Sequence, residues 1–163
     1  MASGITNKGK AWILETVFRL EINGGSLNTR MYIALIKDDN IPNADDTTWA
    51  DLNGTEIAVD NNYTAGGTAL TLGTTDFNAV ISDADADTND YGYIQLKDIS
   101  WTASGGSIPA SGDGASYAVL MDNAGGAADN TANKLIAWWD LGSARTVSDG
   151  QTLTLQDLEI RLT

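Results

Sequence analysis

The chain has 163 residues with no cysteine and no histidine, and its 22 acidic residues outnumber its 9 basic residues, which gives a formal net charge of -13 at pH 7. These absences exclude disulfides, zinc–thiolate sites and every catalytic triad or metal site that depends on imidazole. The negative charge disfavours direct binding to nucleic acid or to an anionic membrane surface. A chain of this length can bury one core, so we predict a single domain over residues 1–163.

The first part of the chain predicts an arm followed by a helix. Residues 1–8 are small and polar and are expected to form a flexible N-terminal arm. Apolar residues recur at three- and four-residue steps from Ala11 to Ile22, which predicts an α-helix over about residues 7–21. No basic region leads into an apolar run with a cleavage site, and no apolar run reaches about 18 residues, so we predict neither a signal peptide nor a membrane span.

A buried strand and a polar loop are expected next. Residues 29–37 are apolar at both alternating sets of positions, which predicts a strand covered on both faces. Residues 38–53 are polar, and their lone Trp49 is expected to anchor this loop to the body of the protein. Further short strands are predicted in three β-prone segments: 56–59, 68–72 and 76–81.

The acidic run DADADTND, residues 83–90, places carboxylates at every second position, as at the start of a calcium loop. Such a loop also needs a glycine for its sharp turn and a bidentate glutamate at its end, where this chain has Thr88 and Ile94. We therefore predict a solvated loop and no metal site. The residues to test for residual calcium binding are Asp83, Asp85 and Asp87.

The second half of the chain predicts mostly strands. Residues 91–103 predict either one long strand or a bent pair of strands, and residues 116–122 predict a buried strand. Residues 124–133 are small and polar and predict a mobile loop. The strand predicted at residues 134–142 places Trp138 and Trp139 on opposite sides, with one ring in the core and the other at a surface or interface.

The last segment alternates leucines with polar residues but breaks the alternation between Leu155 and Leu158. An extra residue near Gln156 and Asp157 would restore one buried face, so a β-bulge is predicted there. Together, the short strands and the single early helix predict a mainly β fold, a β-sandwich or jelly-roll-like domain with one N-terminal α-helix.

No catalytic residue and no cofactor are predicted. Carboxylate catalysis needs two acids that face each other across a cleft, and sequence places no two acids together. Those most embedded among apolar residues are Glu56, Asp98, Asp140 and Glu159.

Carbohydrate stacking by Trp138 or Trp139 is an alternative, because aromatic rings bind the faces of sugars. The apolar strand around the pair favours a place in the core and a subunit interface over sugar binding.

Four segments of the chain follow one another in a characteristic order. A helix with ITNKGKAWIL precedes the strand MYIALIKDD, and the later strand YAVLMD precedes the ending KLIAWWDLGSARTVSDGQTL. This order resembles a family of small structural proteins from the virions of tailed bacteriophages. The closest matches to the family pattern are Glu56, Tyr63 and residues 117–122 and 135–155.

The resemblance implies a non-enzymatic capsid decoration, or cement, protein on the virion surface, made in the host bacterial cytoplasm. Its partners would be the major capsid protein and other copies of itself, in an oligomer such as a trimer. A tail-fibre or baseplate-associated structural protein is one alternative, and a carbohydrate-binding module is another. The aromatic residues selected as interface candidates are Trp12, Phe18, Trp49, Trp138 and Trp139.

Overall fold

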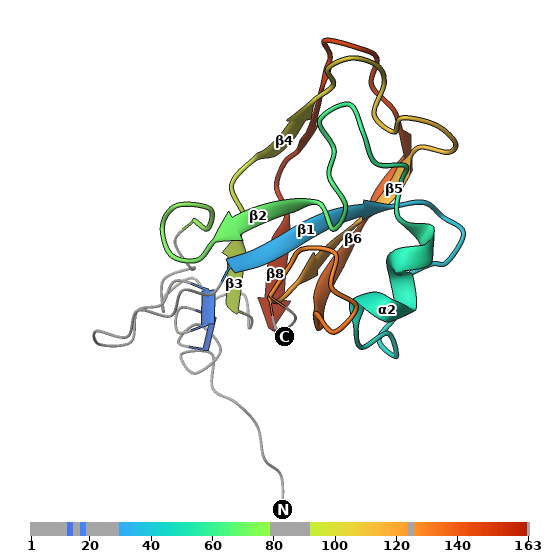
Figure 1. Cartoon of the computed structure of the whole chain (residues 1–163). Helices are drawn as coiled ribbons and strands as arrows, with labels where there is room; N and C mark the ends of the chain where they lie inside the picture. Colours follow the sequence, from blue (N-terminus) through green and yellow to red (C-terminus); the bar gives the residue numbers. More distant parts are fainter. Residues whose placement is uncertain (1–12, 15–16, 19–29, 79–91, 124–125, 163) are drawn as a thin grey trace, which may run out of the picture. The chain divides into compact units, whose positions relative to one another are not determined.

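The computed structural model describes residues 13–14, 17–18, 30–78, 92–123 and 126–162, and it confirms that the chain is mainly β (Figure 1). The chain divides into two compact units, each built from separate segments. Unit 1 contains residues 1–28, 71–99 and 155–163, and unit 2 contains residues 29–70 and 100–154. That these units form one domain stays a prediction.

A four-stranded sheet in the order β2-β1-β5-β6 is the main element of unit 2 (Figure 1). Its strands are β1 (Arg30–Ile36), β2 (Thr68–Thr71), β5 (Ala115–Met121) and β6 (Leu135–Arg145). Each of these strands was predicted from the sequence to within a few residues. All residues of β1 from 31 to 36 are buried, which confirms that this strand is covered on both faces.

A short helix, α2 (Trp49–Leu52), followed by the 3₁₀ turn η2 (Asn53–Thr55), packs on one face of this sheet. The sequence predicted only a loop here. The missed signal was a threonine three residues before an acid: the Asp51 carboxylate accepts the backbone N–H groups of Thr47 and Thr48, each at 2.9 Å. Both hydrogen bonds lower the pKa of Asp51, and the one from the Thr48 N–H has the larger effect.

Trp49 is the anchor of this segment. Its side chain is 1% exposed and belongs to a cluster with Leu52 of α2 and the sheet residues Tyr32, Val119 and Met121. The prediction that Trp49 fixes the polar loop to the body of the protein is therefore confirmed.

The predicted strand over residues 91–103 is a bent pair. β3 (Gly92–Gln95) pairs with β8 (Glu159–Leu162) in unit 1, whereas β4 (Ile99–Thr102) pairs with β7 (Thr152–Leu155). The bulge predicted near Gln156 and Asp157 is wrong, because β7 ends and β8 begins with a different partner strand. Asp157 has φ +56°, a left-handed conformation that turns the chain between the two strands.

In unit 1, the Phe18 ring packs on Phe77 with 5.4 Å between ring centroids. Four residues of the predicted N-terminal helix are described, and Ile13, Leu14, Val17 and Phe18 all have helical conformations. The rest of that helix, the predicted arm and the acidic run lie outside the described residues.

Candidate functional site

Strand β6 exposes two large apolar side chains. It is an edge strand of the unit 2 sheet, and Ile136 is 42% and Trp138 43% exposed. Trp138 lies directly opposite Val119 of β5, and Trp139 lies opposite Ala118, so the two tryptophans point to opposite faces of the sheet, as predicted. Trp139 is half-buried and Trp138 is exposed, so the predicted placement of one of these rings in the core is wrong.

A β-bulge places Ile136 outside the regular pairing of β5 and β6. Leu120 lies opposite Ala137 and Met121 opposite Leu135, which leaves Ile136 as the extra residue of β6. Such an insertion re-aims the side chains next to it. The bulge therefore presents Ile136 at the surface although the strand around it is apolar.

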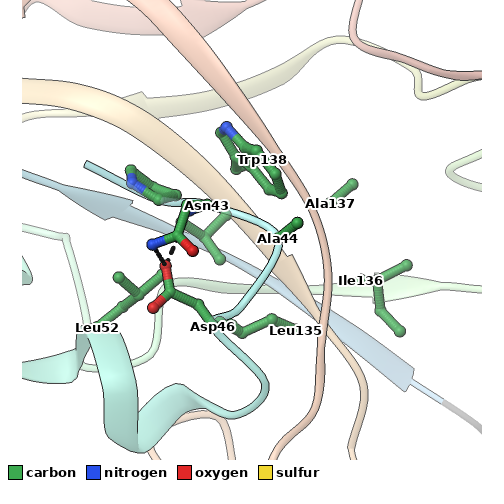
Figure 2. A pocket seen from close by; sticks show the side chains of 10 residues that line it. Asn43, Ala44, Asp46, Leu52, Leu135, Ile136, Ala137 and Trp138 are labelled. Carbon is green, nitrogen blue, oxygen red and sulfur yellow. Dashed lines mark hydrogen bonds between the residues drawn. The ribbon is translucent and has the colours of Figure 1, made fainter. Parts of the chain in front are cut away.

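A pocket of about 130 Å³ lies beside Trp138 in unit 2 (Figure 2). Its walls come from Leu52 of α2, Val119 of β5, residues 135–138 of β6 and the loop residues 42–44 and 46. Figure 2 shows the side chains of Leu135 and Trp138 on the same side of β6 as the loop side chains, whereas those of Ile136 and Ala137 point away from them. The lining is mixed: Asn43 and Asp46 are polar, and the other lining side chains are apolar, so the pocket can hold a small apolar group next to polar neighbours.

Local hydrogen bonds hold the loop that closes this pocket. The Asp46 carboxylate accepts the backbone N–H of Asn43 at 2.9 Å and its amide at 3.1 Å, and the Asn43 side chain accepts the N–H of Asp45 at 2.9 Å. The Leu135 N–H donates to the Thr47 carbonyl at 3.0 Å, which ties the end of the loop to β6. These hydrogen bonds fix the position of the loop, and with it the shape of the pocket.

Carboxylates predominate around the pocket. Asp46 lines it, Asp45 is exposed next to it in the loop, and Asp140 lies two residues after Trp138 on the same face of β6. The exposed Lys134, just before β6, is the basic residue nearest in sequence to the strand portion that lines the pocket. The site therefore combines an apolar centre with an acidic surrounding.

A partly buried polar cluster in unit 2 centres on Glu56, which is half-buried, and Tyr63, which is buried. The Tyr63 hydroxyl accepts the N–H of Leu35 at 2.9 Å and donates to Glu56 Oε1 at 2.9 Å, and the Gly66 N–H donates to the same oxygen at 2.7 Å. Burial, followed by the nearby charge of Glu56, raises the pKa of Tyr63. The cluster joins β1 to the loop after η2, which is a structural role.

Replacing Tyr63 with phenylalanine is expected to lower the free energy of unfolding by about 1–3 kcal/mol, because the Leu35 N–H is left without its acceptor and Glu56 keeps only the donor from Gly66. Urea unfolding measures the change. Tyr117→Phe is the matched control, since the Tyr117 hydroxyl has no hydrogen bond among the described residues. Equal losses in both variants would contradict this role for Tyr63.

Glu56 gives a pH-dependent prediction. Burial raises the pKa of Glu56 and outweighs the hydrogen bonds from Tyr63 and Gly66, which lower it. Between the ordinary glutamate pKa of about 4.3 and the raised pKa, the folded state binds more protons than the unfolded state. The contribution of Glu56 to stability is therefore full at low pH and falls as pH rises through this window.

Glu56→Gln removes this titration. We expect the stability of the variant relative to the natural protein to rise with pH across the window and then to level off. Unfolding by urea at a series of pH values measures the difference, in which groups common to both proteins, such as Asp51, cancel. Asp45→Asn, at an exposed position, is the control. A difference that falls as pH rises would show that Glu56 is stabilised as the charged form.

The four predicted embedded acids each have different polar partners. Glu56 and Asp140 belong to unit 2, and Asp98 and Glu159 to unit 1. Asp98 accepts a hydrogen bond from Gln156 at 2.9 Å, Asp140 accepts the Gly142 N–H at 2.7 Å, and Glu159 forms an ion pair with Arg161. Among the described residues, no group of three acids could hold a metal ion.

The interface candidates have different environments. Trp49 is buried in the core of unit 2, and Phe18 is buried against Phe77 in unit 1, so neither ring has a surface to offer a partner. Trp12 lies outside the described residues, as do the calcium candidates Asp83, Asp85 and Asp87. Trp138 is the candidate that the structure exposes most clearly. The sequence predicted neither the pocket beside it nor the exposure of Ile136.

Comparisons with protein-family models, curated proteins and solved structures gave no match for this chain. Within the described part of the chain, no helix is both long and apolar enough to cross a membrane.

Proposed function

We propose that this chain is a non-enzymatic structural protein of a tailed-phage virion, and specifically a decoration protein that binds the major capsid protein lattice. The observation that carries the proposal is the exposed ring of Trp138 beside a small pocket, in a chain of net charge -13. A large exposed aromatic ring in a highly charged chain suits a docking surface. The order of sequence segments, which resembles phage virion proteins, supports the same proposal.

A decoration protein acts by mass action. Because it binds the assembled lattice and not its separated subunits, each bound copy lowers the free energy of the assembled state. Stabilising a lattice by binding requires a rigid binding surface and no catalytic residues. In unit 2, a sheet that carries Trp138 on its edge strand and a hydrogen-bonded loop beside it provides such a surface.

The proposal extends to the finer fold and to assembly. We propose that the sheets pack as a β-sandwich or jelly roll, and that copies associate as a symmetric oligomer such as a trimer on the capsid surface. Symmetric association would bury apolar surface that a single copy leaves exposed.

Copy number in purified virions tests this function. Quantitative mass spectrometry should find hundreds of copies of the chain per particle, in proportion to the major capsid protein. A few or tens of copies would instead favour the tail-fibre or baseplate alternative, and absence from the particle would reject both.

A carbohydrate-binding module is the second candidate, and the exposed ring of Trp138 favours it. A glycan array with the natural protein and the Trp138→Ala and Trp139→Ala variants tests it. Binding to a defined sugar that either substitution abolishes would support this function over decoration.

A further inference from the structure

We propose that the pocket beside Trp138 binds a single aliphatic side chain presented by a lysine- or arginine-rich segment of a partner protein. The partner's identity as a capsid protein rests on the proposed function, whereas its chemistry follows from the pocket and its surroundings.

The size of the pocket fits one side chain. Its volume is about 130 Å³, and an apolar protein cavity of about 150 Å³ can bind benzene. The pocket is therefore too small for an oligosaccharide or a nucleotide, and it matches the branched end of a leucine or isoleucine. Leu52 and Val119, both buried, form its apolar floor.

Trp138 forms the wall that a partner would cover. The ring lines the pocket and is 43% exposed, so one part of it already packs against the protein and the other part faces solvent. Tryptophans that border a pocket in this way are enriched among the residues that contribute most to binding. An aliphatic group in the pocket would contact this ring.

The charged residues near the pocket determine which partner residues can flank the bound aliphatic side chain. Asp45, Asp46 and Asp140 are acidic, and Lys134 is basic. Complementary charge speeds association and disfavours partners of like charge. A segment with lysine or arginine on either side of the aliphatic residue fits this arrangement.

A second copy of this chain is a poorer occupant. It would bring the same acidic surroundings and a further formal net charge of -13 to the interface. Like-charge contacts cost free energy unless salt screens them. The acidic surface therefore favours a basic partner over self-association through this pocket.

Binding of short synthetic peptides to the full chain tests the inference. The first peptide has one leucine between lysines, the second has alanine in place of the leucine, and the third has glutamates in place of the lysines. Heteronuclear NMR follows the indole N–H signal of Trp138, which is assigned by its loss in Trp138→Ala. We expect the leucine–lysine peptide to shift this signal and to bind more weakly at high salt.

Three variants locate the site and one serves as a control. Trp138→Ala, and Ala44→Leu, which fills the pocket while Trp138 stays in place, should each weaken binding at least about tenfold. Asp45→Lys should weaken it by removing a complementary charge. The loop contact with Asn43 is made by the Asp45 backbone N–H and not by its carboxylate, so the substitution keeps that contact. Val59→Ala removes an equally exposed side chain of unit 2, 47% exposed, and should leave binding unchanged.

Equal binding of all three peptides, or no effect of Trp138→Ala and Ala44→Leu, would overturn the inference. A concentration-dependent dimer in analytical ultracentrifugation that Trp138→Ala abolishes would also overturn it and would assign the pocket to a second copy. These outcomes are independent of copy number in virions: peptide binding by a chain that is absent from particles rejects the proposed function alone, and abundant copies without peptide binding reject the inference alone.

Discussion

Replacing Gly67 with alanine is expected to lower the free energy of unfolding by at least about 3 kcal/mol. Gly67 has φ +77°, a left-handed conformation that costs other residues about 1–2 kcal/mol. A Cβ atom at this position would also lie 1.9 Å from the carbonyl oxygen of Ile33 in the central strand β1. Because that neighbour is backbone in a buried strand, it cannot move aside without disturbing the sheet.

Gly112→Ala separates the cost of the left-handed conformation from the cost of the steric clash with β1. Gly112 has φ +75°, almost the same as Gly67, but no atom lies within 4 Å of the position its Cβ would take. This control should lose only the conformational cost of about 1–2 kcal/mol. Denaturant unfolding of both variants gives the difference. Equal losses would contradict the close approach of Gly67 to β1.

Replacing Trp49 with alanine has the second large expected effect, a loss of about 3–5 kcal/mol. The ring is 1% exposed and fills the space between α2 and the sheet, so its removal leaves a cavity that the surrounding residues can only partly close. The backbone hydrogen bond from the Trp49 N–H to the Asn133 carbonyl, 2.8 Å, is retained in the variant. The loss therefore reports side-chain packing.

Ile41→Ala is the control for Trp49, because Ile41 lies in the same polar segment but is 63% exposed. Its substitution should change stability by no more than about 0.5 kcal/mol. A loss below about 1 kcal/mol for Trp49→Ala would mean that this ring does not fix the segment to the sheet.

The strands of unit 2 could be predicted because their patterns are local. The apolar run at residues 29–37 and the apolar strand at residues 116–122 each suffice to identify a buried strand. Helix α2 was missed because four residues carry no helical period, and its capping threonine and acid are common in loops. Its position depends on Trp49, whose burial required a sheet face that lies elsewhere in the sequence.

The C-terminal segment shows why strand partners are harder to predict than strands. Leu153, Leu155 and Leu158 are all buried, which fits the predicted return to one apolar face. A bulge within one strand and a break between two strands both explain that pattern. The left-handed Asp157 selects the break, and no sequence signal distinguishes an aspartate in this conformation from one in a bulge.

The candidate site could be predicted only in part. Trp138 was selected as an aromatic residue within a strand, and its exposure follows from the position of β6 at the sheet edge. The pocket could not be predicted, because residues 42–46 and 135–138 are far apart in the sequence and meet only through the sheet. Trp49 and Trp138 were both selected as aromatic candidates, and packing alone assigns one to the core and the other to the surface.

Electron microscopy of the whole virion tests the central claim most directly. If the chain is a decoration protein, density that fits the four-stranded sheet of unit 2 should recur over the capsid surface, with the Trp138 side of β6 against the major capsid protein. Density for the chain confined to the tail, or capsids that lack it, would contradict the claim.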